Sequence, residues 1–223
     1  MRLMMKNWAG LFDWDGVIVD SSRPHEEAWE ILAKREGRVC PPGFFPKSFG
    51  MKNEKVIPEL LKWTDDPNEI HRISLKKEAI YRELIKRDGI KILPGVKEWL
   101  QQLKERSIAC AIASSTIREN IDCAIEILGI GQYFQAIVAG EDVKHGKPDP
   151  EVFLLAAKRL DRKPQDCVVF EDAHVGVEAG LNAGMNVVAL ATTHPAKSLK
   201  KAHIVVDNFT QLKLSDVDSL FEK

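Results

Sequence analysis

Short apolar runs alternate with amphipathic stretches along most of this chain. Runs without polar breaks, as in strands buried on both faces of a parallel sheet, predict strands at 9–13, 108–113, 136–139, 167–170, 186–190 and 204–206. Apolar residues at helical spacing between these runs predict helices at 96–105, 117–128, 150–160 and 175–183. Strands that alternate with helices favour the α/β class, with a doubly wound, Rossmann-like parallel sheet.

The segment between the first two predicted strands follows a helical pattern instead. Helices are predicted there at 24–36, 53–63 and 66–86. Pro58 must lie in the first turns of the middle helix or kink it, because proline lacks the backbone N–H that a helix interior needs. No strand is expected between residues 20 and 90.

This helical block interrupts the α/β pattern after its first strand. We therefore expect residues 20–95 to form an inserted helical cap, and residues 1–19 and 96–223 to form the α/β core. The chain crosses between the two parts near residues 20–22 and 93–95, and these crossings are candidate hinges for cap movement.

Composition narrows the classes of protein that this chain can represent. Its 223 residues, 44% of them hydrophobic, suffice for one large domain or for a core with a smaller insertion. The net charge of −1 offers no basic footprint, so neither nucleic acid nor an anionic membrane is an expected partner.

Location and assembly follow from the same composition. No apolar stretch approaches the ~20 residues that span a bilayer, and the amino terminus lacks a secretory pattern. The four cysteines are far apart in the sequence, without the spacing of a zinc site or a disulfide framework. We expect a cytoplasmic, reduced protein, and a monomer.

Polar residues follow four of the predicted strands. They are Asp13 and Asp15, Ser114-Ser115-Thr116, Gly146-Lys147-Pro148-Asp149-Pro150, and Glu171-Asp172. Each group has a local explanation as a helix cap or a turn. In an open α/β sheet, however, ligands bind beyond the carboxyl ends of the strands, so their joint occurrence on one sheet edge favours a shared site.

The spacing of Asp13 and Asp15 points to a cation or a shared proton. Two carboxylates one residue apart at a strand end crowd together, which is costly unless their charge is compensated. Asp13 and Asp172 are the candidate carboxylate ligands of Mg²⁺, which prefers oxygen ligands together with a phosphate. The chain can bend at Gly16 and leave both oxygen groups beside one point.

Phosphoryl transfer is the chemistry that these residue types can perform. Asp13 can attack phosphorus as an ionised nucleophile and form an aspartyl phosphate. Asp15 can protonate the leaving alcohol and later activate water. Lys147 supplies a positive charge for the phosphate, and Ser114 and the neighbouring Ser115 supply a hydroxyl and backbone N–H groups.

Three segments carry a resemblance to a known family. Residues 12–21, 146–151 and 171–180 are similar to motifs of the haloacid dehalogenase superfamily, and within it to the β-phosphoglucomutase-like branch, which includes many sugar-phosphate phosphatases. Trp14 and Ala173 depart from the residues usual in that branch, without touching the chemistry.

The resemblance implies roles for the acidic residues. Asp13 would be the nucleophile and Asp15 the acid/base. Mg²⁺ would be held by Asp13, the backbone carbonyl of Asp15 and Asp172, with Glu171 acting directly or through water.

Residues of the cap bear on the substrate. The resemblance matches His25 to a histidine thought to steer the acid/base in the mutases. Counted from Gly50, Asn53 stands where the mutases carry an arginine, with Lys52 beside it, and Lys77 falls near a second cap lysine. Lys52, Asn53 and Lys77 are candidate substrate contacts, although a solvated surface charge is the favoured interpretation of both lysines.

Three functions stay open on these grounds. A Mg²⁺-dependent phosphatase acting on a small phosphorylated metabolite, such as a sugar phosphate, leads because the mutase arginine is absent. A β-phosphoglucomutase-type phosphomutase is the alternative. A catalytically silent binding module is the third, against which stands the intact set of motif residues.

Overall fold

A parallel sheet forms the centre of the molecule. The computed structural model describes residues 8–48 and 51–222, and over these residues it shows a six-stranded sheet in the order β5-β4-β1-β6-β7-β8. Its strands are β1 (Ala9–Phe12), β4 (Cys110–Ala113), β5 (Ala136–Val138), β6 (Cys167–Glu171), β7 (Asn186–Leu190) and β8 (Ile204–Val206). Every neighbouring pair is parallel, so all carboxyl ends lie at one edge. The predicted doubly wound fold is confirmed.

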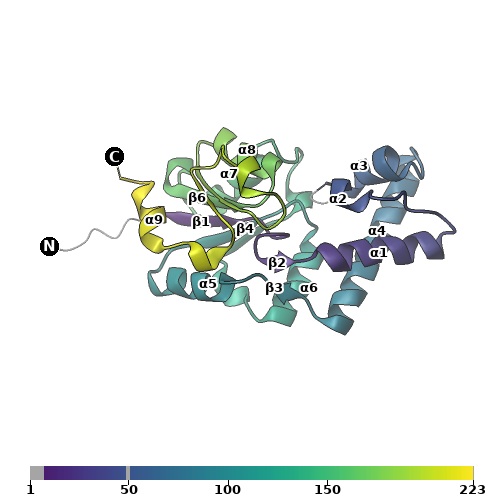
Figure 1. The fold of residues 1–223 in the computed structure, drawn as a ribbon, viewed down its shortest axis with the longest axis horizontal. Coiled ribbons are helices and arrows are strands. Elements are labelled where there is room, and N and C mark those ends of the chain that lie inside the picture. Colours follow the sequence, from purple (N-terminus) through teal and green to yellow (C-terminus); the bar gives the residue numbers. More distant parts are fainter. Residues whose placement is uncertain (1–7, 49–50, 223) are drawn as a thin grey trace.

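Helices cover both faces of this sheet (Figure 1). They are α5 (Val96–Glu105), α6 (Arg118–Leu128), α7 (Glu151–Arg159), α8 (His174–Asn182) and the short α9 (Leu214–Ser219). Because side chains alternate along a strand, β1 contributes Leu11 to one buried cluster and Phe12 to the other. Phe12 stacks on Phe170 of β6 with ring centroids 4.5 Å apart, which fixes the two central strands against each other.

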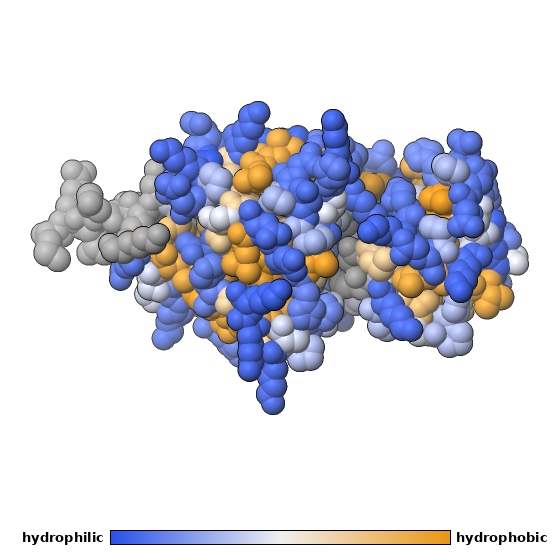
Figure 2. Space-filling model, turned by 90° about the horizontal axis from the view of Figure 1, so that it is seen from above, coloured by the Kyte–Doolittle hydropathy of each residue, from blue (hydrophilic) through white to orange (hydrophobic). Residues whose placement is uncertain are grey.

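The helical insertion lies to one side of the sheet, at the right in Figure 1. It consists of α1 (Ser22–Arg35), α2 (Phe45–Ser48), α3 (Asn53–Lys55), a π-helix (Val56–Leu61) and α4 (Pro67–Asp88). The face in Figure 2 is mostly hydrophilic, with smaller hydrophobic areas between charged side chains. No helix among the described residues is long and apolar enough to cross a membrane.

Two short strands, which the sequence pattern does not reveal, join the insertion to the core. β2 (Val19–Asp20) pairs antiparallel with β3 (Lys91–Ile92), so the two chain crossings lie side by side. Strands of two residues are too short to leave a periodic signal. The expected domain boundaries and the hinge motion stay predictions, and residues 1–7 of the expected core lie outside the described residues.

The predicted helix at 53–63 is the element that differs most from expectation. Only its first turn is α-helical, and the chain continues as the π-helix with Pro58 inside it. In a π-helix the hydrogen bonds join residues five apart instead of four. Pro58 thus lies in the first turns of the predicted helix, at a point where the helical turn is wider.

Candidate active site

Pairing of the two central strands brings three candidate residues together. Phe12 is opposite Phe170 in the parallel register, so Asp13 and Glu171 follow at the same level of the sheet edge. The ammonium of Lys147 lies between them, 2.7 Å from Asp13 Oδ1 and 2.6 Å from Glu171 Oε1. The loop that carries Lys147 thus reaches back to the first strand, as the strand-end argument predicts.

Asp13, Glu171 and Asp172 form a compact group of possible metal ligands. One oxygen of each carboxylate lies within 4.8 Å of the others, and all three residues are buried. Among the described residues, the ammonium of Lys147 is paired with two of these carboxylates, those of Asp13 and Glu171. Three carboxylates beside one ammonium leave an excess of negative charge, which an oxygen-liganded cation such as Mg²⁺ would neutralise.

The pKa values of Asp13 and Asp172 are consistent with this excess of negative charge. Burial, followed by the charges of Glu171 and Asp13, raises the pKa of Asp172 well above its ordinary value. Burial likewise raises the pKa of Asp13 to about 7, although Lys147 acts in the opposite direction. Both shifts show that a further positive charge at this point would be stabilising, so the residues fit a divalent cation.

Backbone and hydroxyl donors orient the two acidic residues after β6. Glu171 Oε2 accepts hydrogen bonds from the backbone N–H groups of Asp172 (2.8 Å) and Ala173 (2.9 Å). The Thr193 hydroxyl donates to Asp172 Oδ2. Both oxygens of Glu171 are thus held, because Lys147 binds Oε1. Asp172 accepts the Thr193 hydroxyl at Oδ2, so its Oδ1 is the oxygen that can bind a ligand.

Asp15 faces the helical insertion. Its carboxylate accepts hydrogen bonds from the hydroxyls of Ser21 (2.5 Å) and Thr116, and His25 Nε2 lies 3.6 Å from Oδ1. Burial alone would raise the pKa of Asp15, but His25 and the two hydroxyls together lower it to about 2. Asp15 is therefore ionised in this arrangement.

The loop after β4 carries Ser114 and Ser115 to the same edge. Ser114 is buried, its Oγ accepts from the backbone N–H of Thr116 (3.1 Å), and its own N–H donates to Val138 (3.0 Å). Ser115 is partly exposed. The interpretation of these residues as a helix cap is wrong, because α6 has Ile117 at its N-cap without a side-chain hydrogen bond. Ser114 instead closes a local turn, and Thr116, two residues further, reaches Asp15.

The three cap candidates have definite partners. Lys52 Nζ donates to the carbonyl of Gly140, 3.1 Å away. The Asn53 amide donates to Ser74 Oγ (2.9 Å) and Glu78 Oε1 (2.7 Å). Gly50, the reference for the mutase comparison, lies outside the described residues.

The interpretation of Lys77 as a solvated charge is wrong. Lys77 is only 3% exposed, and its ammonium lies 2.7 Å from His25 Nδ1 and 3.0 Å from Glu78 Oε1. Its polar face on α4 packs against α1 instead of facing water. A buried ammonium needs such partners, because an isolated buried charge is costly.

Several contacts at the site were not predicted from the sequence. Ser21 holds Asp15, and Thr193 holds Asp172. Thr116, which the sequence places at this sheet edge without a role, also holds Asp15. Thr193 could have been found, because it follows β7 at the same sheet edge. Glu78 carries no motif, and only its contacts in three dimensions identify it.

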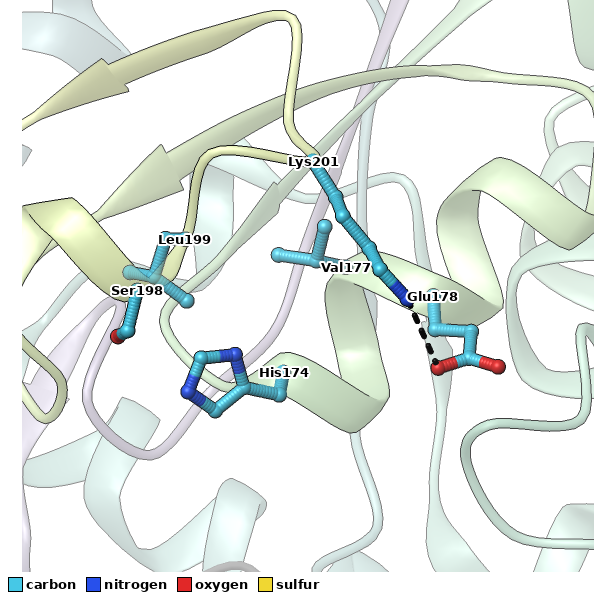
Figure 3. A pocket seen from close by; sticks show the side chains of 6 residues that line it. All are labelled: His174, Val177, Glu178, Ser198, Leu199 and Lys201. Atoms are coloured by element: carbon cyan, nitrogen blue, oxygen red, sulfur yellow. Dashed lines mark ion pairs between the residues drawn. The ribbon is translucent and has the colours of Figure 1, made fainter.

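A small pocket lies beside α8 (Figure 3). Its volume is about 80 Å³, and its lining residues are His174, Val177, Glu178, Ser198, Leu199 and Lys201. Lys201 and Glu178 form an ion pair across it at 3.8 Å. Ligand pockets usually hold at least ~300 Å³, so this one is too small for a sugar phosphate.

Gly16 provides a test of the local geometry. Its φ is +82°, and a Cβ built there would lie 2.1 Å from Asp172 Oδ2. Gly16→Ala should therefore strain the loop and displace the Asp172 carboxylate, with a loss of unfolding free energy of roughly 1–3 kcal/mol. Gly43→Ala is the control, since Gly43 also has positive φ but the described residues place no atom within 4 Å of the added Cβ. Equal thermal stability and activity of both variants would contradict the close packing at Gly16.

Comparison with known proteins places the chain in a family. Residues 9–184 match the family model of haloacid dehalogenase-like hydrolases. The chain belongs to this family. The resemblance inferred from the motifs is confirmed, and with it the expectation of an enzyme of this hydrolase type.

The relatives share most of this chain. It is 37% identical over 217 residues to the chloroplastic 5-amino-6-(5-phospho-D-ribitylamino)uracil phosphatase of Arabidopsis thaliana, over 96% of this chain and 58% of that protein. It therefore spans less than two thirds of that relative's length. A phosphorylated carbohydrates phosphatase of Thermotoga maritima is 33% identical over 181 residues, covering 79% of this chain and 82% of that protein.

A solved structure agrees with the fold. The crystal structure of β-phosphoglucomutase from Clostridium difficile is similar with a TM-score of 0.83 and 31% identity, over 96% of each chain. Phosphatases and a mutase thus both stand among the relatives, so the comparisons leave the choice between the two reactions to the site itself.

Proposed function

We propose that this chain is a Mg²⁺-dependent phosphatase that hydrolyses a small phosphomonoester, such as a sugar phosphate, through an aspartyl phosphate. The observation that carries the proposal is the buried carboxylate of Asp13, paired at 2.7 Å with Lys147 and grouped with Glu171 and Asp172. The names of two relatives support the substrate class. A cytoplasmic location and a monomeric state stay predictions.

In the first step, Asp13 attacks phosphorus and the bond to the leaving alcohol breaks. Asp13, the backbone carbonyl of Asp15 and Asp172 would hold Mg²⁺, with Glu171 acting directly or through water, and the ion would neutralise phosphate charge. Lys147 pairs with the phosphate oxygens and with Asp13. Asp15 supplies a proton to the alcohol oxygen.

Asp15 changes its protonation state during the cycle. As a carboxylate it can take a proton from the water that attacks the aspartyl phosphate in the second step, which regenerates Asp13 and releases phosphate. In the first step it must be protonated. A phosphate dianion bound beside it favours protonation, because a nearby negative charge raises the pKa of a carboxyl group.

Asn53 favours water over a sugar hydroxyl as the acceptor. A mutase must hold the second phosphate of a bisphosphate intermediate, which calls for a positive charge in the cap. Asn53, at the position of the mutase arginine, is a neutral amide that donates to the carboxylate of Glu78. The Glu78 carboxylate is itself paired with Lys77 at 3.0 Å, so Asn53 and its partner add no free positive charge for a second phosphate.

A product assay separates hydrolysis from phosphomutase activity. The protein is incubated with Mg²⁺, β-glucose 1-phosphate and a trace of the bisphosphate, and inorganic phosphate and glucose 6-phosphate are measured. We expect phosphate release without accumulation of glucose 6-phosphate. A burst of glucose 6-phosphate with little phosphate released would favour the mutase instead. If this ester is a poor substrate, the same two products are followed after a screen of phosphorylated metabolites.

Metal binding should stabilise the fold more strongly at high pH. The pKa of Asp13 is raised from 3.8 to about 7, so its contribution to the stability of the metal-free protein is complete below about pH 4 and lost as the pH rises through about 7. Mg²⁺ replaces the proton and should restore that stability.

Adding Mg²⁺ should raise the melting temperature more at pH 8 than at pH 5. We expect the two increases to differ by at least about 2–4 °C, because ~1 kcal/mol of stability shifts the melting temperature of a domain of this size by that amount. Thermal unfolding with and without the ion measures it. In Asp13→Asn, which cannot titrate there, the difference between the two pH values should shrink. A larger stabilisation at pH 5 would contradict the assignment.

A further inference from the structure

Glu78 is a buried carboxylate on α4 with three hydrogen-bond donors around it. Its Oε1 accepts from Lys77 Nζ (3.0 Å) and Asn53 Nδ2 (2.7 Å), and its Oε2 accepts from Asn120 Nδ2 (2.6 Å). Glu78 is 7% exposed and Asn120 is 1% exposed. Such a convergence of donors requires a carboxylate, since a neutral amide would present donors of its own to one side.

The contact between Glu78 and Asn120 joins the helical insertion to the core. Glu78 belongs to α4, whereas Asn120 belongs to α6, which follows β4 of the sheet. The two helices pack against each other and lie close together in Figure 1. Arg82 NH1 donates to Asn120 Oδ1 at 2.9 Å, which fixes the orientation of the amide so that its NH₂ group faces Glu78.

The same carboxylate is connected to Asp15 through two side chains. Lys77 has no acceptor, so its ammonium must donate to His25 Nδ1, 2.7 Å away. Because Nδ1 accepts from Lys77, the N–H of the His25 ring lies on Nε2, the nitrogen 3.6 Å from Asp15 Oδ1. Tyr81 stacks on the imidazole at 4.0 Å with an interplanar angle of 12°, which holds the plane of the ring.

We propose that Glu78 and Asn120 are positioning residues for the acid/base Asp15, acting through Lys77 and His25. Asn120 can donate to Glu78 only while α4 lies against α6, so the contact reports that the insertion is docked on the core. Glu78 then holds the Lys77 ammonium at Nδ1 of His25, and His25 presents its N–H to Asp15. The inference rests on the proposed function, because it assigns Asp15 the role of proton donor.

Leaving-group dependence tests this role. An alkyl alcohol needs a proton as it leaves, whereas nitrophenolate leaves as a stable anion and needs little acid catalysis. The ratio kcat/KM covers only the steps up to transfer of phosphate to Asp13. We therefore compare kcat/KM for a sugar phosphate that the wild-type protein hydrolyses with kcat/KM for p-nitrophenyl phosphate, both with Mg²⁺.

In Glu78→Gln, kcat/KM for the sugar phosphate should fall about 10- to 100-fold more than kcat/KM for p-nitrophenyl phosphate. This difference is smaller than the full contribution of acid catalysis, because Asp15 itself remains and only its positioning is lost. The matched control is Glu83→Gln. Glu83 is a 66% exposed glutamate of α4 that pairs with Arg35 of α1 at 3.8 Å, so its loss leaves Glu78, Asn120 and Arg82 untouched. This control should leave the ratio of the two substrates unchanged.

Asn120→Ala gives a second route to the answer if Glu78→Gln folds poorly. It should show the same substrate dependence, and the double variant should be no worse than the more affected single variant, because both residues act through one connection. An equal loss for both substrates, or additive effects, would overturn the positioning role. If the wild-type protein with Mg²⁺ hydrolyses neither ester, the phosphatase proposal itself fails, which is a different result.

Discussion

Asp13→Asn should lose nearly all turnover while the protein remains folded. An amide cannot attack phosphorus, and removal of a covalent nucleophile lowers the rate by roughly three powers of ten or more. The fold should survive, because the amide has the shape of the carboxylate. It also removes one negative charge from the acidic cluster of Asp13, Glu171 and Asp172. Steady-state hydrolysis and thermal unfolding measure the two effects.

Asp20→Asn is the matched control for this variant. Asp20 is an exposed aspartate of β2, a few residues further along the same loop, and its carboxylate accepts from the Ser22 hydroxyl. The control should keep wild-type activity. Retention of more than a few per cent of turnover by Asp13→Asn would mean that another group attacks phosphorus.

Asp172→Ala should make activity depend on far more Mg²⁺. The variant removes one of the two carboxylates assigned to hold Mg²⁺, so the remaining groups alone must align the phosphate. We therefore expect turnover at low millimolar Mg²⁺ to fall by roughly 10²-fold or more. Metal titrations of activity measure the shift. EDTA should abolish the activity of the wild-type protein, and re-addition of Mg²⁺ should restore it.

Two controls sharpen this prediction. Asp142→Ala removes an exposed aspartate that is paired with Arg159, and it should leave the metal requirement unchanged. Calcium should inhibit, because its larger and looser coordination shell disturbs the in-line geometry. Undiminished activity after exhaustive chelation would show that the acidic group serves another purpose.

The sheet and the nucleophile end of the site could be predicted because both follow from buried strands. A strand buried on both faces leaves a run of apolar residues, and the polar residue that ends the run marks the sheet edge where ligands bind. Asp13 and Asp172 were found in this way, and Lys147 was found in the polar loop that comes after the third predicted strand. The structure groups all three around one point. The roles of these residues nevertheless stay proposals until they are tested.

The cap side of the site could not be predicted in the same way. Helical periodicity tells which face of α4 is apolar, but it does not tell whether a charged residue on that helix meets water or a partner. Lys77 and Glu78 are buried because His25 comes from α1 and Asn120 from α6, 52 and 42 residues away in the sequence. Only the folded chain brings these partners together.

The covalent role of Asp13 has a direct test in the stereochemistry at phosphorus. A thiophosphate ester made chiral with one oxygen isotope is hydrolysed by the wild-type protein in water that carries a second isotope, and the configuration of the released thiophosphate is determined. Attack by Asp13 followed by attack of water gives two inversions. We therefore expect net retention of configuration, whereas net inversion would show that water attacks the ester directly and that Asp13 forms no bond to phosphorus.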